Sequence, residues 1–459
     1  MPADARGGPA SPALVSGWGN TAPSSAEWLA PTDRAGLEAG VDRAPRRGVI
    51  ARGLGRAYGD AAQNAGGRVL EATGVSGLRS LDLARGVVTA EAGTSLDDLM
   101  RWLVPLGWFV PVTPGTRFVT VGGAVASDIH GKNHHSAGSW CHHVRRLTLH
   151  TPAHGTVTIG PDAEPELFWA TVGGMGLTGV ILDVTFDLSP IETSLIRVDT
   201  DRAADLDEVM ALMASGDDAY PYSVAWIDLM ATGRSMGRSV RDRGACASRK
   251  ERSPRQRRRP LDFAPRSLIG APGFVPGGLL NPWTIRAFNE VWFRKAPRRR
   301  RDHLQSITAF FHPLDLVDRW NRLYGSPGFL QWQFVVPFGA EETLRGIVGE
   351  LSASGCTSFL SVLKRFGPAN PGLLSFPGPG WTLTLDIPAS VTGLAGLLDR
   401  LDEDVVDAGG RVYLAKDSRL RPELLPAMYP RLDEWRKIRA AADPDGVLQS
   451  DLSRRLRLC

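Results

Sequence analysis

The sequence predicts an α+β fold in which a glycine-rich first domain precedes a domain built on an antiparallel sheet. Two glycine-rich segments, residues 52–60 and 120–131, each follow a stretch that favours a β-strand. Residues 329–335 and 381–387 alternate apolar and polar side chains, which is typical of strands with two different faces. A length of 459 residues favours two or three domains.

The first domain is expected to alternate short strands and helices. Strands are predicted at 48–51, 87–92 and 180–186, and a short helix at 166–170. Ser95 is the N-cap of a further helix, and Pro105 ends it because the residue before a proline avoids helical geometry. Turn residues Ser189 and Pro190 mark the end of this domain.

The glycine-rich segments indicate a bound anion. Glycine accepts positive φ, so Gly53, Gly55 and Gly59 are expected to turn several backbone N–H groups toward one phosphate. Gly122 and Gly123 would bring a second loop close to the same ligand. One such segment is commonly only a turn. Two of them, with a histidine in the second, predict a large phosphate-bearing cofactor held along its length.

The second domain is predicted from strands that have one polar face. Strands are expected at 222–227, 329–335, 358–364 and 381–387. Gln331 and Gln333 share a face of one strand, and Thr382, Thr384 and Asp386 share a face of another. This pattern favours an antiparallel sheet with one face on a helix layer. The polar face either meets water or lines a substrate pocket above the cofactor.

The composition is that of an ordinary globular protein, with 43% hydrophobic residues. Cys141, Cys246, Cys356 and Cys459 form no CxxC pair, so we expect neither a disulfide framework nor a zinc site, and a reducing compartment fits. No signal peptide and no membrane-spanning run is visible. We expect a cytoplasmic protein or one peripheral to the inner membrane, with a periplasmic location left open.

Positive charge is concentrated in residues 241–259, which hold nine Lys and Arg against two acidic residues, and in the run 298–301. One interpretation is a solvated, mobile loop. The other is attraction to anionic lipid head groups or to nucleic acid. No aromatic-rich nucleic-acid motif accompanies the arginines, so we expect no nucleic-acid partner and prefer contact with a membrane surface.

Several motifs carry a resemblance to a known family. Residues 52–60, 63–64, 114–117, 120–123 and above all 128–138 resemble the vanillyl-alcohol-oxidase-type flavoproteins, which have a PCMH-type FAD-binding domain. The likeness continues through 168–174, 311–315, 331–333, 366–368, 415–419 and 450–451. It covers nearly the whole chain except the arginine-rich insert, and the segment 128–135 is its most specific part.

The resemblance implies FAD, held non-covalently by two α/β subdomains in residues 1–193. Residues 194–410 would form the substrate domain, with a basic insert near 234–300, and residues 411–459 would return to the FAD domain. The cofactor-binding residues that it implies are Ala51, Arg52, Gly53, Leu54, Gly55, Arg56, Ala57, Tyr58, Gly59, Asp60, Ala61, Gly115, Thr120, Val121, Gly122, Gly123, Ser127, Asp128, Ile129, His130, Ile181 and Tyr413.

The activity that the resemblance implies is oxidation of a sugar secondary alcohol to a ketone. The most similar members oxidise the 2′-hydroxyl of polyprenylphosphoryl-β-D-ribose on the way to a cell-wall arabinose donor, and an NAD-dependent short-chain reductase partner completes the epimerisation. His130 and Tyr58 are the candidates to orient or deprotonate the hydroxyl. Lys416 would oppose negative charge on the reduced flavin, or else form a surface salt bridge with Asp417 or Glu423.

The substrate contacts carried over are Trp226, Gln331, Gln333, Lys364, Thr382 and Thr384, and Lys364 could meet the substrate phosphate as a point charge. Thr384 stands where the family has a reactive cysteine, Thr382 where it has Asn, and Phe311 where it has Tyr. Lys132, His134 and His135 form a polar cluster without a carboxylate or cysteine at ligand spacing, so no metal is expected.

Two other functions stay open at this point. One is an FAD-dependent oxidase of a soluble sugar or aldonolactone, similar to D-arabinono-1,4-lactone oxidase. The other is a non-enzymatic basic module that binds lipid or nucleic acid through its arginines.

Overall fold

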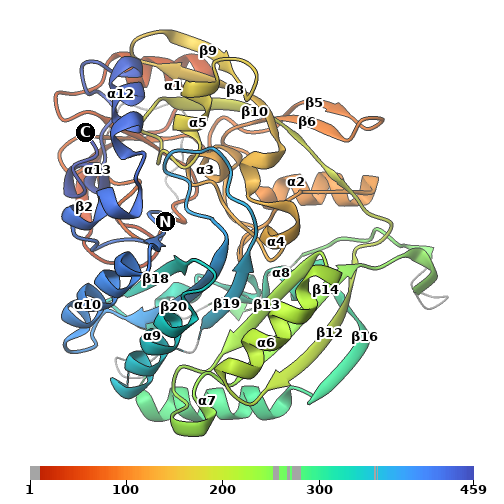
Figure 1. Ribbon diagram of the computed structural model, residues 1–459. Helices are drawn as coiled ribbons and strands as arrows, with labels where there is room; N and C mark the ends of the chain where they lie inside the picture. Colours follow the sequence, from red (N-terminus) through yellow and green to blue (C-terminus); the bar gives the residue numbers. More distant parts are fainter. Residues whose placement is uncertain (1–10, 252–257, 266–268, 271–280, 356–357, 359) are drawn as a thin grey trace.

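The computed structural model describes residues 11–251, 258–265, 269–270, 281–355, 358 and 360–459. The described chain forms two sheet-based units, and the C-terminal helices lie against the first of them (Figure 1). Helices and mixed sheets both contribute, so the α+β class is confirmed.

The first unit begins with a four-stranded sheet in the order β1-β2-β4-β3. Its strands are β1 (Ser11–Val15), β2 (Ser24–Leu29), β3 (Val49–Arg52) and β4 (Arg68–Glu71). β4 runs parallel to β2 and β3, whereas β1 pairs antiparallel with β2. Helix α1 (Arg34–Asp42) begins at the N-cap Asp33, and its Leu37 and Val41 join the apolar cluster under this sheet.

A second, five-stranded antiparallel sheet follows in the order β5-β6-β10-β8-β9. Its strands are β5 (Leu78–Asp82), β6 (Val87–Glu91), β8 (Val144–Thr151), β9 (Gly155–Ile159) and β10 (Val180–Asp187). The helices of this part are α2 (Leu96–Leu103), α3 (Val121–Ala126), α4 (His134–Ala137) and α5 (Pro165–Thr171). Two short strands, β7 (Trp108–Phe109) and β11 (Ser189–Pro190), pair with each other at the boundary of the unit.

The sequence-based predictions for this unit were partly correct. The Ser95 hydroxyl accepts from the Asp98 N–H and starts α2, as predicted, and one 3₁₀ turn at Val104–Leu106 follows the helix. The expected strand before the second glycine segment is wrong, because Thr120 makes only an isolated bridge to Ser95. The first residues of this segment are helical, because Thr120 is the N-cap of α3 and its hydroxyl accepts from the Gly123 N–H.

The second unit is an antiparallel sheet of eight strands in the order β16-β12-β14-β13-β19-β20-β18-β21. The strands are β12 (Leu195–Ala203), β13 (Tyr222–Ile227), β14 (Ser239–Cys246), β16 (Arg299–Ser306), β18 (Phe329–Val336), β19 (Ser361–Phe366), β20 (Gly380–Pro388) and β21 (Arg411–Val412). Two further short strands, β15 (Ile269–Gly270) and β17 (Val317–Asp318), form a separate parallel pair.

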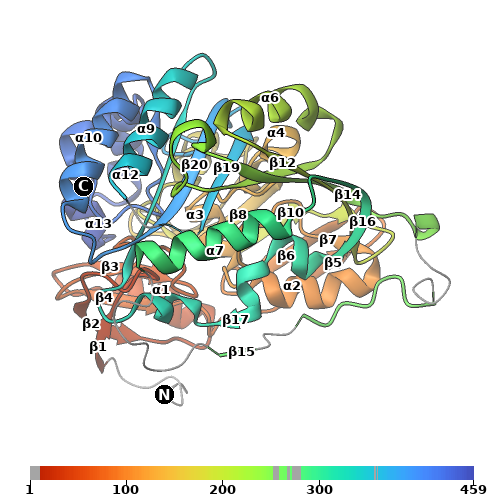
Figure 2. The same cartoon turned by 90° about the horizontal axis from the view of Figure 1, so that it is seen from below.

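Helices cover one face of this large sheet. They are α6 (Leu206–Gly216), α9 (Glu341–Ala353) and α10 (Leu394–Asp407), and Figure 2 shows them on one side of the sheet with the first unit on the other. Helix α7 (Pro282–Lys295) lies on the side of the first unit in Figure 2, and Phe310 and Phe311 of α8 (Ile307–Phe311) join the apolar cluster of that unit. Because the strands alternate, the polar side chains of β18 and β20 face the first unit, while Leu383, Leu385 and Ile387 join the core under the helices.

The C-terminal segment ties the two units together. Strand β21 still belongs to the large sheet, and the chain returns to the first unit after it. Helices α11 (Leu425–Met428), α12 (Leu432–Ala442) and α13 (Asp451–Arg455) follow. The Trp435 indole donates to the Ala170 carbonyl, and the Arg455 guanidinium pairs with Asp60 at 2.7 Å.

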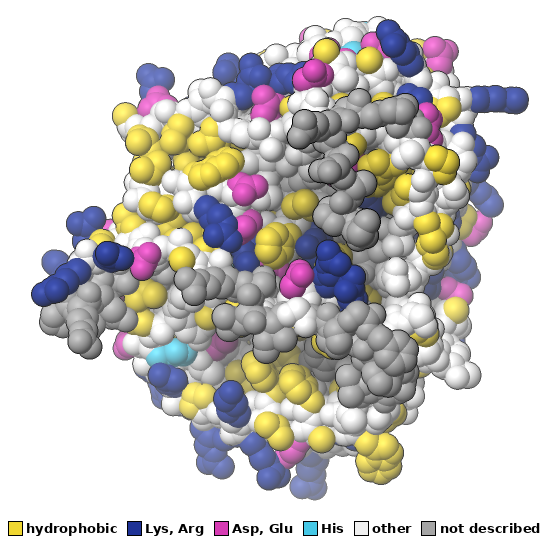
Figure 3. Space-filling model, turned by 180° about the vertical axis from the view of Figure 1, so that it is seen from behind, with side chains coloured by type: hydrophobic (Ala, Val, Ile, Leu, Met, Phe, Trp, Pro, Cys, Tyr) yellow, Lys and Arg dark blue, Asp and Glu magenta, His cyan; other side chains and the backbone are white. Residues whose placement is uncertain are grey.

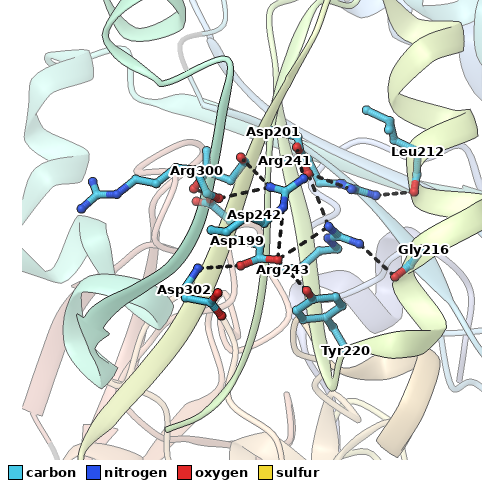
Figure 4. A network of polar contacts seen from close by, with 12 residues as sticks. Asp199, Asp201, Leu212, Gly216, Tyr220, Arg241, Asp242, Arg243, Arg300 and Asp302 are labelled. Atoms are coloured by element: carbon cyan, nitrogen blue, oxygen red, sulfur yellow. Dashed lines mark hydrogen bonds and ion pairs between the residues drawn. The ribbon is translucent and has the colours of Figure 1, made fainter. Parts of the chain in front are cut away.

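The arginine-rich stretch is not simply a solvated loop. Arg241 and Arg243 lie on β14, opposite Asp201 and Asp199 of β12, and all four side chains are buried (Figure 4). Arg241 reaches Asp201 at 3.0 Å, and Arg243 reaches Asp201 at 3.5 Å and Asp199 at 3.9 Å. Both guanidinium groups also donate to carbonyls of α6, so they anchor that helix to the sheet. Other members of the stretch, Arg252, Arg255 and Arg257, lie outside the described residues, as does Cys356.

Candidate active site

A cavity of about 580 Å³ lies between the two units. It is lined by the first glycine segment, the start of α3, the loop that follows it and the polar face of the large sheet. The structure brings together on its wall the following residues that the sequence analysis had named: Ala51, Arg52, Gly53, Leu54, Gly55, Arg56, Ala57, Tyr58, Ala61, Gly115, Thr120, Gly122, Gly123, Ser127, Ile129, His130, Ile181, Trp226, Gln331, Gln333, Lys364, Thr384, Tyr413 and Lys416.

The first glycine segment presents free backbone donors to this cavity. Among the residues that the structure describes, the N–H groups of residues 53–57 donate no hydrogen bond to the rest of the protein. Of the three glycines expected at positive φ, only Gly55 has it, at +64°. Gly53 is required for space instead, because a Cβ there would lie 2.3 Å from the Thr120 hydroxyl oxygen. Gly59 likewise packs against the backbone of Asp417.

The second segment lies directly beside the first, because a Cβ on Gly53 would touch Thr120. A Cβ on Gly122 would lie 2.9 Å from the Ala92 methyl group, so glycine lets α3 pack closely against the end of β6. Asp128 has a positive φ of 39° and is fully buried. Its carboxylate accepts from Asn370, Ser375 and the Cys141 N–H. This anchors the chain where it turns from α3 toward His130.

Five of the named residues do not line the cavity. Gly59, Asp60, Val121, Asp128 and Thr382 are absent from its wall. Asp60 is ion-paired with Arg455, and Val121 belongs to the apolar core. The first four are adjacent in sequence to lining residues, and the Thr382 hydroxyl contacts the lining residue Gln333.

His130 is held by a short chain of hydrogen bonds from the large sheet. The Thr382 hydroxyl donates to the Phe334 carbonyl, so it accepts from the Gln333 amide nitrogen at 3.1 Å. The same amide nitrogen lies 2.9 Å from His130 Nε2, which therefore accepts. The imidazole proton must then be on Nδ1, which faces the Lys364 amine at 3.2 Å.

This arrangement favours a neutral amine at Lys364. A proton on His130 Nδ1 donates to Lys364 Nζ only if that nitrogen keeps its lone pair. Burial, together with the positive charges of Lys416 and Lys132, lowers the pKa of Lys364 to about 7. Burial also holds the pKa of His130 well below its usual range, so the imidazole stays neutral.

Lys416, Tyr58 and Asp386 form a second buried group at the other end of the polar face. The Lys416 ammonium lies 3.9 Å from the centre of the Tyr58 ring. Burial lowers the pKa of Lys416 and raises that of Asp386, whose carboxylate accepts from Gln331. Lys416 is thus not part of a surface salt bridge with Asp417 or Glu423. Burial also raises the pKa of Tyr58, which makes this phenol a donor rather than a base.

Sequence reasoning missed several lining residues. Asp242 lies between Arg241 and Arg243, and because a strand alternates, it faces the cavity while both arginines face α6. That alternation was visible in the sequence once 239–246 was recognised as a strand. Lys132 also lines the cavity, with its ammonium donating to the Phe310 carbonyl, and burial lowers its pKa to about 8.

The polar cluster at 132–135 is structural apart from Lys132. His134 Nδ1 accepts from the Gly367 N–H, and His135 Nε2 donates to the Tyr220 carbonyl. Within the described ranges, no group of three His, Cys, Asp or Glu side chains could hold a metal ion.

The site fits FAD in the chemistry of its walls. Free N–H groups in a glycine-rich turn suit a diphosphate, and small or apolar residues such as Ala61, Ile129 and Ile181 leave flat walls for a ring system. The long cavity spans both glycine segments and ends at the polar sheet face.

Comparisons with known proteins agree with this fit. A family described as "FAD binding domain" matches residues 28–160, and one described as "D-arabinono-1,4-lactone oxidase" matches residues 399–456. The solved structure of a single-residue variant of Physcomitrella patens BBE-like 1 superposes with a TM-score of 0.66 at 14% identity, and covers 93% of this chain and 90% of that one. This likeness shows the fold.

Two curated relatives are similar in sequence. The decaprenylphosphoryl-beta-D-ribose oxidase of Mycolicibacterium smegmatis is 47% identical over 450 residues, which is 96% of this chain and 97% of that protein. The "Uncharacterized protein in mprA 5′region" of Streptomyces coelicolor is 44% identical over 373 residues, which is 79% of this chain and all of that protein. The chain therefore belongs to the decaprenylphosphoryl-β-D-ribose oxidase family, whose members are FAD-dependent oxidoreductases of the vanillyl-alcohol-oxidase type with a PCMH-type FAD-binding domain.

Proposed function

We propose that this enzyme oxidises the 2′-hydroxyl of a polyprenylphosphoryl-β-D-ribose to the ketone. The observation that carries the proposal is the 47% identity to a decaprenylphosphoryl-β-D-ribose oxidase over nearly the full length of both chains. The cavity supports it independently, because it sets two buried lysines, Lys364 and Lys132, on the side of the sheet domain, where an anionic substrate would meet them.

Lys364 is the residue that we assign to the hydroxyl proton. Its pKa of about 7 leaves about half of the amine unprotonated near pH 7, and the proton on His130 Nδ1 holds that neutral form in place. The 2′-hydroxyl and the anomeric phosphate are on neighbouring carbons, so one amine can face both. The phosphate charge raises the basicity of that amine and favours transfer of the hydroxyl proton to Nζ. This role replaces His130 and Tyr58 as the base, and leaves them to orient Lys364 and the hydroxyl.

Bound FAD would supply the acceptor for the hydride that leaves the carbinol carbon. The chain's contribution at that end is Lys416, whose protonated form stabilises negative charge developing in the cavity. Tyr58 packs its ring against the Lys416 ammonium and edge-on against Phe329, so it fixes the direction of the lysine.

The product would be a lipid-linked keto sugar, and a reductase is required to complete an epimerisation. We propose an NAD-dependent short-chain reductase as that partner, with both enzymes working in the cytoplasm or at the inner membrane.

A soluble aldonolactone is the alternative substrate. The match of residues 399–456 to the D-arabinono-1,4-lactone oxidase family favours it. That match covers the C-terminal segment but not the strands that carry Gln331, Gln333 and Lys364. It therefore says less about the substrate than the full-length relative does.

Anaerobic flavin bleaching tests the proposal. The purified holoenzyme is mixed without oxygen with a short-chain polyprenylphosphoryl ribose, with free ribose or with an aldonolactone, and loss of the oxidised flavin spectrum is followed. We expect bleaching only by the phosphoryl ribose. Bleaching by the aldonolactone alone would replace the proposed substrate with the alternative.

A further inference from the structure

Helix α7 carries an unusual outer surface. Among the helices of the described ranges, none is long and apolar enough to cross a bilayer. Helix α7 instead presents several large apolar side chains to the outside of the protein. Trp283 is 78% exposed, Val291 66%, Phe288 46% and Trp292 44%. Phe288 and Trp292 stack on each other with ring centres 6.0 Å apart.

The opposite side of α7 is attached to the protein. Ile285 and Asn289 are buried, and the Asn289 amide donates to the Asp228 carboxylate at 2.7 Å. Glu290 pairs with Arg238 at 2.6 Å. The helix is therefore held with its aromatic side outward, and the exposure of that side is not a consequence of loose packing.

Positive charge gathers at the C-terminal end of this outer surface. Residues 282–301 contain seven Lys and Arg and one acidic residue, Glu290. Arg294 and Lys295 are exposed in the last turn, and the exposed Arg298, Arg299 and Arg300 follow it. Figure 3 shows hydrophobic side chains on the lower part of the rear face, with Lys and Arg side chains projecting at its lower edge. Figure 1 places α7 at that end of the molecule.

The surface is also continuous with the active site. Trp292 is both part of the exposed aromatic side and part of the cavity wall. Figure 2 shows α7 on the same side of the large sheet as the first unit, which is the side of the cavity. A molecule bound along α7 therefore meets the cavity wall at Trp292.

We propose that the outer side of α7 docks on the surface of an anionic lipid bilayer, with Trp283, Phe288 and Val291 inserted at the head-group level and Trp292 at the edge next to the cavity. Tryptophan at an interface and flanking Lys or Arg are the features by which helices lie in anionic membranes. A protein partner with an apolar groove would not need the adjacent cluster of positive charge. The orientation lets a lipid-linked sugar enter the cavity past Trp292 while its chain stays in the bilayer. This last step rests on the proposed function, whereas the docking itself does not.

Vesicle co-sedimentation of the full flavin-loaded chain tests the docking. The probes are vesicles of phosphatidylcholine with phosphatidylglycerol and vesicles of phosphatidylcholine alone. We expect binding to the first and much weaker binding to the second. In Trp283→Ser/Val291→Ser and in Arg294→Glu/Lys295→Glu, the partition coefficient on anionic vesicles is expected to fall about tenfold or more.

Matched variants on other surfaces serve as controls. Leu83→Ser/Phe338→Ser removes exposed apolar side chains elsewhere, and Arg400→Glu/Arg457→Glu makes the same change of net charge elsewhere. Equal loss of vesicle binding in the controls would overturn the assignment to α7. So would no binding to anionic vesicles, or a concentration-dependent dimer that Trp283→Ser/Val291→Ser abolishes.

Flavin content and bleaching by a water-soluble short-chain phosphoryl ribose, measured without vesicles, are expected to stay unchanged in the α7 variants. Because the vesicle assay contains no substrate, its failure leaves the proposed oxidation intact. Failure of bleaching in the unaltered enzyme would instead count against the substrate.

Discussion

Gly53→Ala should displace the cofactor without unfolding the protein. The added Cβ would lie 2.3 Å from the Thr120 hydroxyl oxygen and 2.9 Å from its methyl group, whereas ordinary contacts begin at 3.4 Å. One of the two glycine segments must therefore move by about 1 Å. Such a shift breaks hydrogen bonds that form only at about 2.7–3.2 Å.

The magnitude follows from the free N–H groups of residues 53–57. A hydrogen bond to a charged group contributes about 1.5–3 kcal/mol, so losing two of them costs about 3–6 kcal/mol. That corresponds to a roughly 100- to 10,000-fold weaker affinity for FAD. The assay is titration of the apoprotein with FAD, followed by flavin fluorescence, with the melting temperature of the apoprotein as a check on folding.

Two further variants make this experiment specific. Gly346→Ala is the control, because a Cβ there meets nothing within 4 Å, and FAD affinity should not change. Gly53→Ala/Thr120→Ala should recover part of the affinity, since it removes both colliding atoms at the cost of the N-cap of α3. Folded Gly53→Ala that binds FAD within threefold of the unaltered enzyme would refute the proposed cradle.

Three further predictions concern Lys364 and Arg455. If Lys364 takes the hydroxyl proton, kcat/KM for the phosphoryl ribose rises with pH through about 7. The same kcat/KM should fall about 100-fold or more in Lys364→Met. It should not change in Lys437→Met, which alters an exposed lysine. A fall of kcat/KM above pH 7 would show that Lys364 serves only as a cation for the phosphate. The folded-state pKa of Lys364 lies below its unfolded value, so the unfolded chain binds more protons between about pH 7 and 10, and stability should rise with pH across that window. Urea unfolding of the apoprotein checks this, and the slope should be smaller in Lys364→Met. Arg455→Ala leaves Asp60 and the buried Asp417 without their partner and should cost about 2–4 kcal/mol of unfolding free energy, whereas Arg457→Ala, which breaks an exposed pair, should cost less than about 1 kcal/mol.

Local chemistry in the sequence determined the elements and much of the site. Ser95 starts a helix because its hydroxyl caps free N–H groups, and that interaction needs only neighbouring residues. The alternation at 329–335 and 381–387 identified two strands whose polar side chains face one cavity. The motifs at 52–60 and 128–138 indicated the family, which the full-length relative shows.

Which charged side chains pair with each other, and which ionisable groups keep their protons, depends on the tertiary structure. Arg241 and Arg243 look like a basic loop in the sequence, and they are buried because β12 places Asp199 and Asp201 opposite them. The neutral amine of Lys364 depends on Gln333, Thr382 and His130, which come from three separate parts of the chain. Burial and long-range contacts set these properties, and neither can be obtained from the spacing of residues along a sequence.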